Sequence, residues 1–158
     1  MRRRLPNSSG CYVCGSENPR GLGVRFDVEA GVVTARFVPH RDHCGYNDRV
    51  HGGVMAALLD EVMGWAPSVI KRRFCVAAEI IIRYLKPLPI GQAVTVRGEM
   101  TADRGRLWEA QGEITDDSGT VYARGAGKYH PLSEAQTQAV MDYLAVDGRR
   151  VTLDEALG

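Results

Sequence analysis

The spacing of hydrophobic residues along the sequence changes near residue 72, and this change limits the possible folds. Over residues 52–69, apolar side chains recur at spacings of three and four, which is typical of an α-helix. These side chains cover much of the helix circumference, so we expect the helix to be largely buried. Four long segments rich in β-forming residues follow, at 74–85, 93–102, 106–115 and 121–129. The chain therefore combines one long buried helix with a sheet.

Shorter elements flank this pattern. Residues 24–28 and 32–38 are β-rich and separated by a turn at 29–31, which predicts a hairpin that ends at Pro39. Polar turns at 103–105 and 116–119 predict antiparallel hairpins among the later strands. Ser133 is the expected N-cap of a helix that reaches about residue 145, with Glu134 in its first turn. The polar tail from Asp147 is expected to be mobile or to pack on a partner.

These elements predict an α+β fold in one domain, residues 1–158. Its core would span about residues 20–130, and residues 131–158 would form an accessory C-terminal helix and tail. One twisted, mostly antiparallel sheet of about six strands would wrap the central helix. Such a sheet leaves an exposed edge, so we expect a homodimer, with a tetramer as a further option. A chain of 158 residues buries enough surface to fold without a metal or disulfide.

Composition excludes several other classes. The formal net charge of +1 gives no support for nucleic-acid binding, which usually needs a basic patch. The basic residues at positions 2–4 are not followed by an apolar run, so no secretory signal is expected. No segment suggests a membrane span of about 20 apolar residues. We therefore expect a cytoplasmic protein with no membrane partner, in which the four cysteines are free thiols.

The candidate chemistry lies at the start of the long helix and within it. His51-Gly52-Gly53 stands where the loop becomes helix, so close backbone approach, free first-turn amides and the helix dipole could together form an oxyanion hole. A glycine-rich entry needed only for packing explains the same tripeptide. Asp60 lies two and a half turns further on among small apolar neighbours, where burial would make it a better base. An acid exposed at the end of this apolar stripe fits the same pattern. Glu61 is the rival of Asp60, and periodicity alone does not choose between them.

Two further groups have competing interpretations. His51 either caps the helix or acts as a general base. A general-base histidine normally needs a carboxylate that orients it, and Asp42 and Asp48 are candidates only because they are near in sequence, so we favour the cap. Cys11 and Cys14 have metal-ligand spacing, and a zinc site would need ligands from residues 40–44, which include His40, His43 and Cys44. Because a second C-x-x-C is missing, we favour cysteines that pack as small apolar side chains.

The sequence of the long helix resembles the signature of the PaaI-like hotdog-fold acyl-CoA thioesterase family. The resemblance covers roughly residues 11–130 and rests on four segments: Cys11-Tyr12-Val13-Cys14-Gly15, Asn18-Pro19-Arg20-Gly21-Leu22-Gly23, His51-Gly52-Gly53-Val54-Met55-Ala56-Ala57-Leu58-Leu59-Asp60-Glu61, and Arg83-Tyr84-Leu85-Lys86-Pro87 with Gly91 after it. It implies a single hotdog domain.

The resemblance also implies roles. Asp60, nine positions after the histidine, would activate water or attack the thioester, which decides against Glu61. The amide of Gly52 would hold the oxyanion and Gly53 would support the turn. The two groups that face one substrate would come from different protomers, with no metal and no bound cofactor. The sequence departs from the family at two positions, where polar residues are frequent: Gly45 precedes the histidine by six residues, with Asn47 the nearest amide, and Ala77 replaces a hydroxyl residue.

The expected function is hydrolysis of acyl-CoA thioesters, with a medium-chain or aryl acyl group, at a dimer interface. Met63 is a candidate for the acyl pocket. Glu79 either faces the cleft or occupies a surface position of its strand, and we favour the surface position. Arg83 is a candidate for binding coenzyme A phosphates, together with four other basic residues: Arg104, Arg106, Arg124 and Lys128. The alternatives are a non-catalytic acyl-CoA-binding hotdog module and a hotdog hydratase or dehydratase.

Overall fold

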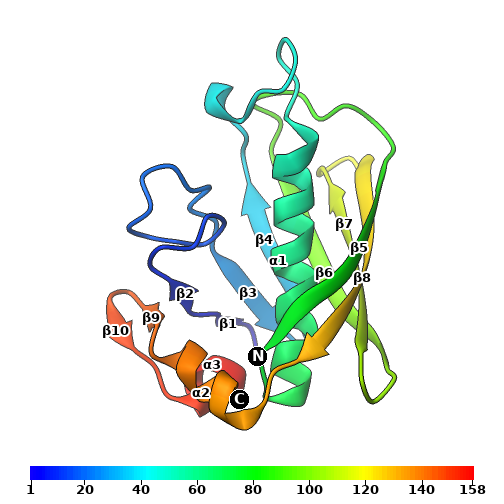
Figure 1. Ribbon diagram of the computed structural model, residues 1–158. Coiled ribbons are helices and arrows are strands. Elements are labelled where there is room, and N and C mark those ends of the chain that lie inside the picture. The colour runs from blue at the N-terminus through cyan, green and yellow to red at the C-terminus, as the bar shows by residue number, and fades with distance from the viewer.

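One long helix stands at the centre of the molecule (Figure 1). The computed structural model describes all residues 1–158. Helix α1 (Gly52–Lys71) follows the N-cap residue His51 and ends at Arg72, whose backbone is left-handed (φ 52°). Its apolar side chains are buried at the predicted spacing: Val54, Met55, Leu58, Leu59, Val62, Met63, Trp65 and Ala66. The helix is therefore the core on which the sheet packs.

Helix α1 is also long and apolar enough to cross a membrane, contrary to the expectation that no segment has this composition. Within its most apolar window, 56% of the segment is buried inside the protein. Burial in its own fold thus accounts for the hydropathy of this helix.

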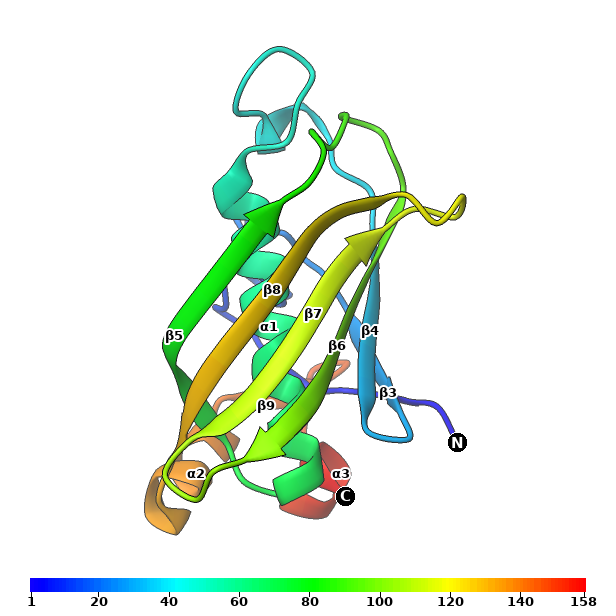
Figure 2. The ribbon, with the colours of Figure 1, turned by 90° about the vertical axis from the view of Figure 1, so that its right-hand side faces the viewer.

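A seven-stranded antiparallel sheet wraps around one side of α1, in the order β1-β3-β4-β6-β7-β8-β5. Figure 2 shows its outer face, with β5 along one free edge. The strands are β1 (Arg3–Arg4), β3 (Phe26–Glu29), β4 (Val32–Phe37), β5 (Cys75–Tyr84), β6 (Val94–Asp103), β7 (Trp108–Thr115) and β8 (Val121–Pro131). Strand β5 pairs only with β8, so one side of this ten-residue strand has no partner within the chain.

A row of three glycines lets the helix approach the sheet closely. Gly98 in β6 pairs with Gly112 in β7, which pairs with Gly125 in β8. A Cβ atom at Gly98 would lie 2.8 Å from the Val62 carbonyl oxygen of α1, and one at Gly125 would lie 3.0 Å from the Met63 Cε. Real Cβ atoms are not found so close to a backbone oxygen, so the helix packs at this depth because the row has no side chains.

The two ends of the chain form a second, smaller layer beside α1. Figure 1 shows both termini next to the C-terminal half of this helix. Leu5 and Leu157 are buried there, at 2% and 1% exposure, and the Arg3 guanidinium donates to the Ala156 carbonyl. The elements are β2 (Asn7–Ser8), β9 (Leu144–Val146) and β10 (Arg149–Arg150) in a three-stranded sheet, with helices α2 (Glu134–Met141) and α3 (Leu153–Leu157). A 3-10 turn, η1 (Arg41–His43), precedes α1.

The predicted architecture is confirmed: the fold is α+β, with a long central helix against a mostly antiparallel sheet and a C-terminal helix. Three details differ. The main sheet has seven strands instead of about six, because the N-terminal residues add β1. Helix α2 ends at Met141 instead of near residue 145, since the chain turns there into β9. The polar tail packs on its own chain as α3, where the apolar residues Ala156 and Leu157 are buried.

Candidate active site

The start of α1 has one amide held by a side chain and one that is free. His51 is the N-cap, and its Nδ1 accepts a hydrogen bond from the Gly53 amide at 2.9 Å. The Gly52 amide makes no hydrogen bond within the chain. A free first-turn amide at the positive end of a helix dipole is suited to binding an oxyanion. The geometry therefore agrees with His51 as a cap and Gly53 as support for the turn, and it leaves Gly52 as the available donor.

Tyr84, at the end of β5, lies against this helix start. Its hydroxyl donates to the Gly52 carbonyl at 2.8 Å. A Cβ atom at Gly52 would lie 3.2 Å from the tyrosine Oη. Tyr84 thus holds the start of α1 against the C-terminal end of β5.

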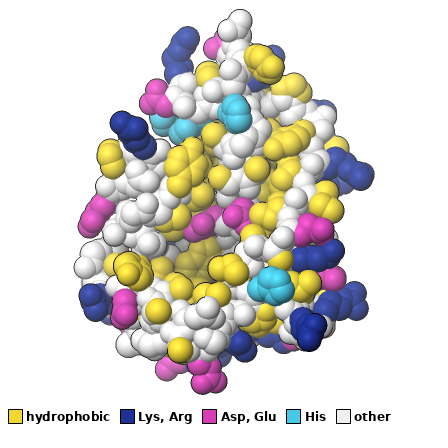
Figure 3. Space-filling view, viewed as in Figure 1, with side chains coloured by type: hydrophobic (Ala, Val, Ile, Leu, Met, Phe, Trp, Pro, Cys, Tyr) yellow, Lys and Arg dark blue, Asp and Glu magenta, His cyan; other side chains and the backbone are white.

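A cavity of about 320 Å³ opens beside the middle of α1. Trp65 and Phe74 form much of its apolar wall, and its two acidic residues are Asp60 and Glu61. Figure 3 shows this character on the face seen in Figure 1: a hollow lined by hydrophobic side chains has acidic side chains at its centre. Such a site suits an apolar ligand group placed next to a carboxylate.

Asp60 lies half-buried in this cavity with one hydrogen-bond partner. The Tyr129 hydroxyl donates to the Asp60 Oδ1 at 3.3 Å and to its backbone oxygen at 3.2 Å. Burial raises the pKa of Asp60, and the hydrogen bond from Tyr129 offsets part of that rise. A desolvated carboxylate held by a single donor is a stronger base than one in water.

Three of the groups around Asp60 were not found by sequence reasoning. Tyr129 is almost completely buried (1% exposed), and its alternating position in β8 looks like that of any core residue. The Cys75 Sγ lies 3.4 Å from the Ser68 Oγ on the cavity wall. Burial raises the pKa of Cys75 to about 11, so this thiol is not a nucleophile at neutral pH. The sequence signals for Cys75 and Ser68, a strand start and a helix position, are equally ordinary.

Glu61 faces a different neighbour from Asp60. The Cys11 Sγ lies 3.9 Å and 4.0 Å from its two carboxylate oxygens. Burial raises the pKa of Glu61 to about 7. Cys14 is also within 4.8 Å of this group, so Cys11, Cys14 and Glu61 converge on one point. The structure thus separates the two adjacent carboxylates, one beside a tyrosine hydroxyl and the other beside two thiols.

The remaining predicted site residues lie elsewhere. Asn47 is exposed in the loop before α1, and with Gly45 it lines a separate surface hollow formed by residues 41 and 44–48. Met63 is fully buried between α1 and the glycine row, and it does not line the Asp60 cavity. Glu79 is exposed on β5 and forms a salt bridge with Lys128 at 2.7 Å. Within one chain, these residues do not join the cavity.

The basic residues considered for coenzyme A binding are all exposed, and most are paired. Arg104 forms a salt bridge with Glu109, and Arg124 with Glu113 at 3.7 Å. Arg83 is exposed on β5 and forms no salt bridge. Arg83 is therefore available to an anionic ligand without loss of an existing pair.

Gly45 and Ala77, the two positions that depart from the family pattern, lie at the helix start and in the Asp60 cavity. A Cβ atom at Gly45 would lie 3.1 Å from the His51 Cα, so the loop packs closely on the helix start there. Ala77 lines the Asp60 cavity without a polar atom in its side chain. The carboxyl groups and the Tyr129 hydroxyl are therefore prominent among the polar groups of this cavity.

Comparisons with known proteins point to one family. Residues 47–123 match the family model described as the thioesterase superfamily. A sequence search of curated proteins gave no match. One similar structure is a thioesterase superfamily protein with 28% identity and a TM-score of 0.72 over 77% of this chain. This chain covers only 60% of the length of that protein.

Two further structures share the fold at lower identity. The E. coli PaaI protein of the phenylacetic acid degradation operon has 19% identity and a TM-score of 0.66, over 71% of this chain and 81% of that one. A Streptococcus mutans protein bound to acetyl-CoA has 20% identity and a TM-score of 0.62, over 66% of this chain and 84% of that one. The likeness to these two structures shows that this chain shares their fold.

Proposed function

We propose that this chain, in which residues 47–123 match the thioesterase superfamily model, is a PaaI-like hotdog protein that hydrolyses acyl-CoA thioesters to a free acid and coenzyme A. The observation that carries the proposal is Asp60, a half-buried carboxylate in an apolar cavity beside Tyr129. As a base, Asp60 takes a proton from the water that attacks the thioester carbonyl. As a nucleophile, its carboxylate attacks that carbon, the C–S bond breaks and coenzyme A leaves as the thiolate, and water then hydrolyses the resulting anhydride to the free acid and Asp60.

The second group of the site is the Gly52 amide, supplied by a partner protomer. Gly52 and Asp60 are eight residues apart on one helix, or ~12 Å along its axis. Since one carbonyl group is only a few ångströms across, the two groups of a single chain cannot act on it together. A site built from Asp60 of one chain and Gly52 of the partner subunit removes this difficulty.

The free edge of β5 offers a way to build that dimer. Val76, near the start of β5, lines the Asp60 cavity, whereas Tyr84, at its end, contacts Gly52. Two copies of β5 paired antiparallel about a two-fold axis near Ile80 would place the start of one strand beside the end of the other. Each Asp60 cavity would then face the helix start of the partner.

The cavity supports a medium-chain or aryl acyl group. Its volume of about 320 Å³ and the aromatic walls from Trp65 and Phe74 suit an apolar group rather than a charged one. Arg83, exposed and unpaired on β5, is placed to meet a coenzyme A phosphate at the interface. The structural neighbour from Streptococcus mutans is bound to acetyl-CoA, which is consistent with this ligand class.

The decisive experiment is thiol release from acyl-CoAs of graded chain length and aromaticity, measured for the wild type and Asp60→Asn. We expect Asp60→Asn to lower kcat by about 10³-fold or more, because the amide can neither accept the proton nor attack. Asp117→Asn, at an exposed carboxylate paired with Arg36, is the matched control and keeps its activity. Full turnover in a folded Asp60→Asn protein would remove Asp60 from the mechanism.

A non-catalytic acyl-CoA-binding module is the second candidate, and Gly45 and Ala77 favour it. Both positions lack the polar side chains that would place water or polarise the carbonyl. Isothermal titration with a non-hydrolysable acyl-CoA analogue separates the two functions. Binding without thiol release from any substrate of the panel would support the module and contradict hydrolysis.

A further inference from the structure

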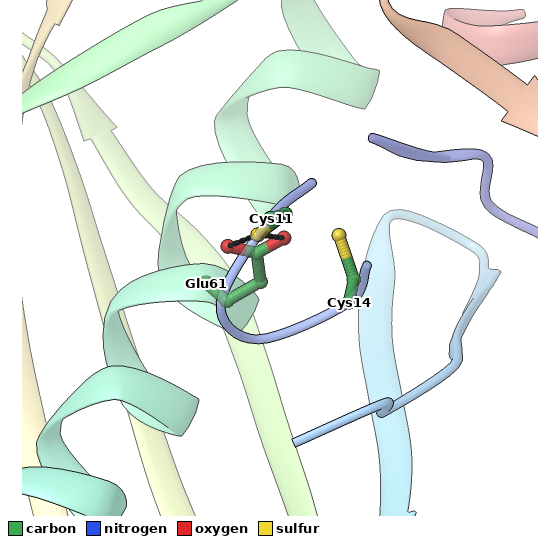
Figure 4. A group of neighbouring side chains, drawn as sticks. All are labelled: Cys11, Cys14 and Glu61. Atoms are coloured by element: carbon green, nitrogen blue, oxygen red, sulfur yellow. Dashed lines mark hydrogen bonds between the residues drawn. The ribbon is translucent and has the colours of Figure 1, made fainter. Parts of the chain in front are cut away.

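Three side chains with metal-binding atoms converge outside the proposed catalytic pair. Cys11 and Cys14 belong to the N-terminal loop, and Glu61 to α1, fifty residues after Cys11 (Figure 4). Their donor atoms all lie within 4.8 Å of one another. In Figure 4 the Cys11 sulfur lies against the Glu61 carboxylate and the Cys14 sulfur points toward the same region. The fold thus brings a C-x-x-C pair to a carboxylate from a distant element.

The loop has a conformation that presents both sulfurs. The Val13 amide donates to the Cys11 Sγ at 3.3 Å, and the Gly15 amide donates to the Cys11 carbonyl at 3.0 Å. A Cβ atom at Gly15 would lie 2.3 Å from that carbonyl oxygen, so the tight turn requires glycine. An amide directed at a cysteine sulfur stabilises the thiolate, which is the form that binds a metal.

The group has acidic donors but no cation of its own. Glu61 forms no salt bridge with any Lys, Arg or His of the chain, although it is partly buried at the cavity wall. A buried carboxylate without a cationic partner is costly, and two adjacent thiols do not compensate a negative charge. A bound cation would balance these donors.

We propose that Cys11, Cys14 and Glu61 bind one zinc ion that fastens the N-terminal loop to α1. Two sulfurs and a carboxylate oxygen match the ligand preferences of zinc. In a tetrahedral zinc site the sulfur-to-oxygen separations are about 3.5 Å, and the Cys11–Glu61 separations of 3.9 Å and 4.0 Å need only a small adjustment to reach this value. The fourth position is left to water.

The structure also corrects the ligand set considered from sequence. His40, His43 and Cys44 do not join Cys11 and Cys14. The His40 and His43 rings pack against each other at a tilt of 45° with centroids 3.9 Å apart, and Cys44 is exposed on the loop. The third ligand is instead Glu61, which lies next to Asp60 on α1, so the zinc would hold the loop at the wall of the proposed active-site cavity.

The test is to titrate the reduced, full-length protein with Zn²⁺ and Co²⁺ after treatment with a chelator. We expect about one zinc per chain by elemental analysis, a rise in Tm of several degrees, and a sulfur-to-cobalt charge-transfer band with Co²⁺. Cys11→Ser should lose the band and weaken zinc binding at least about 100-fold. Cys44→Ser, at an exposed cysteine outside the group, is the matched control and should bind as the wild type does.

Glu61→Gln provides a second variant that keeps both thiols and nearly the same side-chain volume. We expect it to retain part of the charge-transfer band but to bind zinc about tenfold or more weakly. The proposal is overturned if the wild type binds no zinc, if Cys11→Ser binds as tightly as the wild type, or if mass analysis finds the pair oxidised to a Cys11–Cys14 disulfide that excludes the metal. None of these readouts depends on thioester hydrolysis.

Discussion

At the scale of single residues, the adjacent carboxylates of α1 differ because of what faces them. Asp60 accepts a hydrogen bond from Tyr129, whereas Glu61 lies beside Cys11. Both are partly buried, and burial raises the pKa of both. Residue type and burial therefore do not distinguish the roles of Asp60 and Glu61. The group that contacts each carboxylate does. Asp60 has a neutral hydroxyl that orients its carboxylate in the cavity, which fits the role of base.

Replacing Tyr129 by Phe tests this orientation. A hydrogen bond to a charged group contributes about 1.5–3 kcal/mol, and the Tyr129–Asp60 bond is long at 3.3 Å. We expect kcat to fall about tenfold, equivalent to ~1.4 kcal/mol, with KM nearly unchanged because the ring still fills its site. Steady-state kinetics measure this. The control is Tyr122→Phe, on the same strand as Tyr129. It removes a hydroxyl that donates to Asp116 and should leave kcat and KM unchanged. Equal losses in the two variants would indicate a purely structural effect.

Asp27 gives a pH-dependent contribution to stability. Burial tends to raise its pKa, but hydrogen bonds from Arg2 and Arg4 at 2.6 and 2.7 Å outweigh burial and lower it below the ordinary value. The unfolded aspartate titrates near ~3.9. The ion pairs of Asp27 with Arg2 and Arg4 therefore stabilise the folded state fully above about pH 4. This stabilisation is lost as the pH falls through the lower pKa that Asp27 has in the folded state.

The corresponding variant is Asp27→Asn, studied by urea unfolding at several pH values. We expect it to lose about 1–2 kcal/mol of unfolding free energy at pH 7, and the difference from wild type to shrink as the pH falls below about 4. Asp117→Asn breaks an exposed pair with Arg36 and should change stability by less than about 0.5 kcal/mol. A pH-independent difference for Asp27→Asn would contradict the role of the ion pair.

At the scale of elements, the depth at which α1 packs depends on the glycine row of β6, β7 and β8. Gly98 faces the backbone of α1 and Gly125 faces the Met63 side chain. A flexible methionine can yield to an added methyl group, but a helix carbonyl cannot move without displacing the helix. Since Asp60 is on the same helix, a shift of α1 would also move the carboxylate relative to Tyr129 on β8.

Gly98→Ala therefore should destabilise the fold and weaken the site together. An added Cβ 2.8 Å from the Val62 oxygen forces the helix away, and overpacking of this kind costs about 1–3 kcal/mol. Gly64→Ala is the contrasting variant: its Cβ would lie 3.5 Å from Tyr129, an ordinary contact, and alanine in a helix interior should add about 0.5–1 kcal/mol. Thermal unfolding measures both. A neutral Gly98→Ala would show that helix and sheet separate more easily than the structure indicates.

At the scale of the whole molecule, strand β5 leaves one long sheet edge without a partner in the chain. Its ten residues pair only with β8, and exposed apolar side chains follow the strand, including Val76, Ile81 and Tyr84 at 50–60% exposure. Long apolar edges of this kind lead to strand pairing with another chain unless they are blocked. The same edge links the Asp60 cavity at one end to Gly52 at the other, so pairing and catalysis are expected to depend on each other.

Ile81→Lys tests that dependence. Lysine on an edge strand opposes edge-to-edge pairing, and a two-fold axis would bring two such charges close together. Light scattering should show half the mass of the wild type, and thiol release should fall to background while circular dichroism stays unchanged. Ile70→Lys, at an exposed isoleucine (49%) near the end of α1, is the control and should remain dimeric and active. A fully active Ile81→Lys monomer would contradict a shared site.

The helix and strands could be predicted from the amino-acid sequence, because periodicity, turn residues and caps act over a few neighbouring residues. The buried helix, the four long strands and the N-cap at His51 all follow from such local patterns. The contacts between residues far apart in the sequence became visible in the folded chain. Tyr129 reaches Asp60 from 69 residues away and Cys11 reaches Glu61 from 50, because a twisted sheet and a returning N-terminal loop close on one helix. No pattern along the chain specifies such pairs, since their geometry depends on how deeply that helix packs.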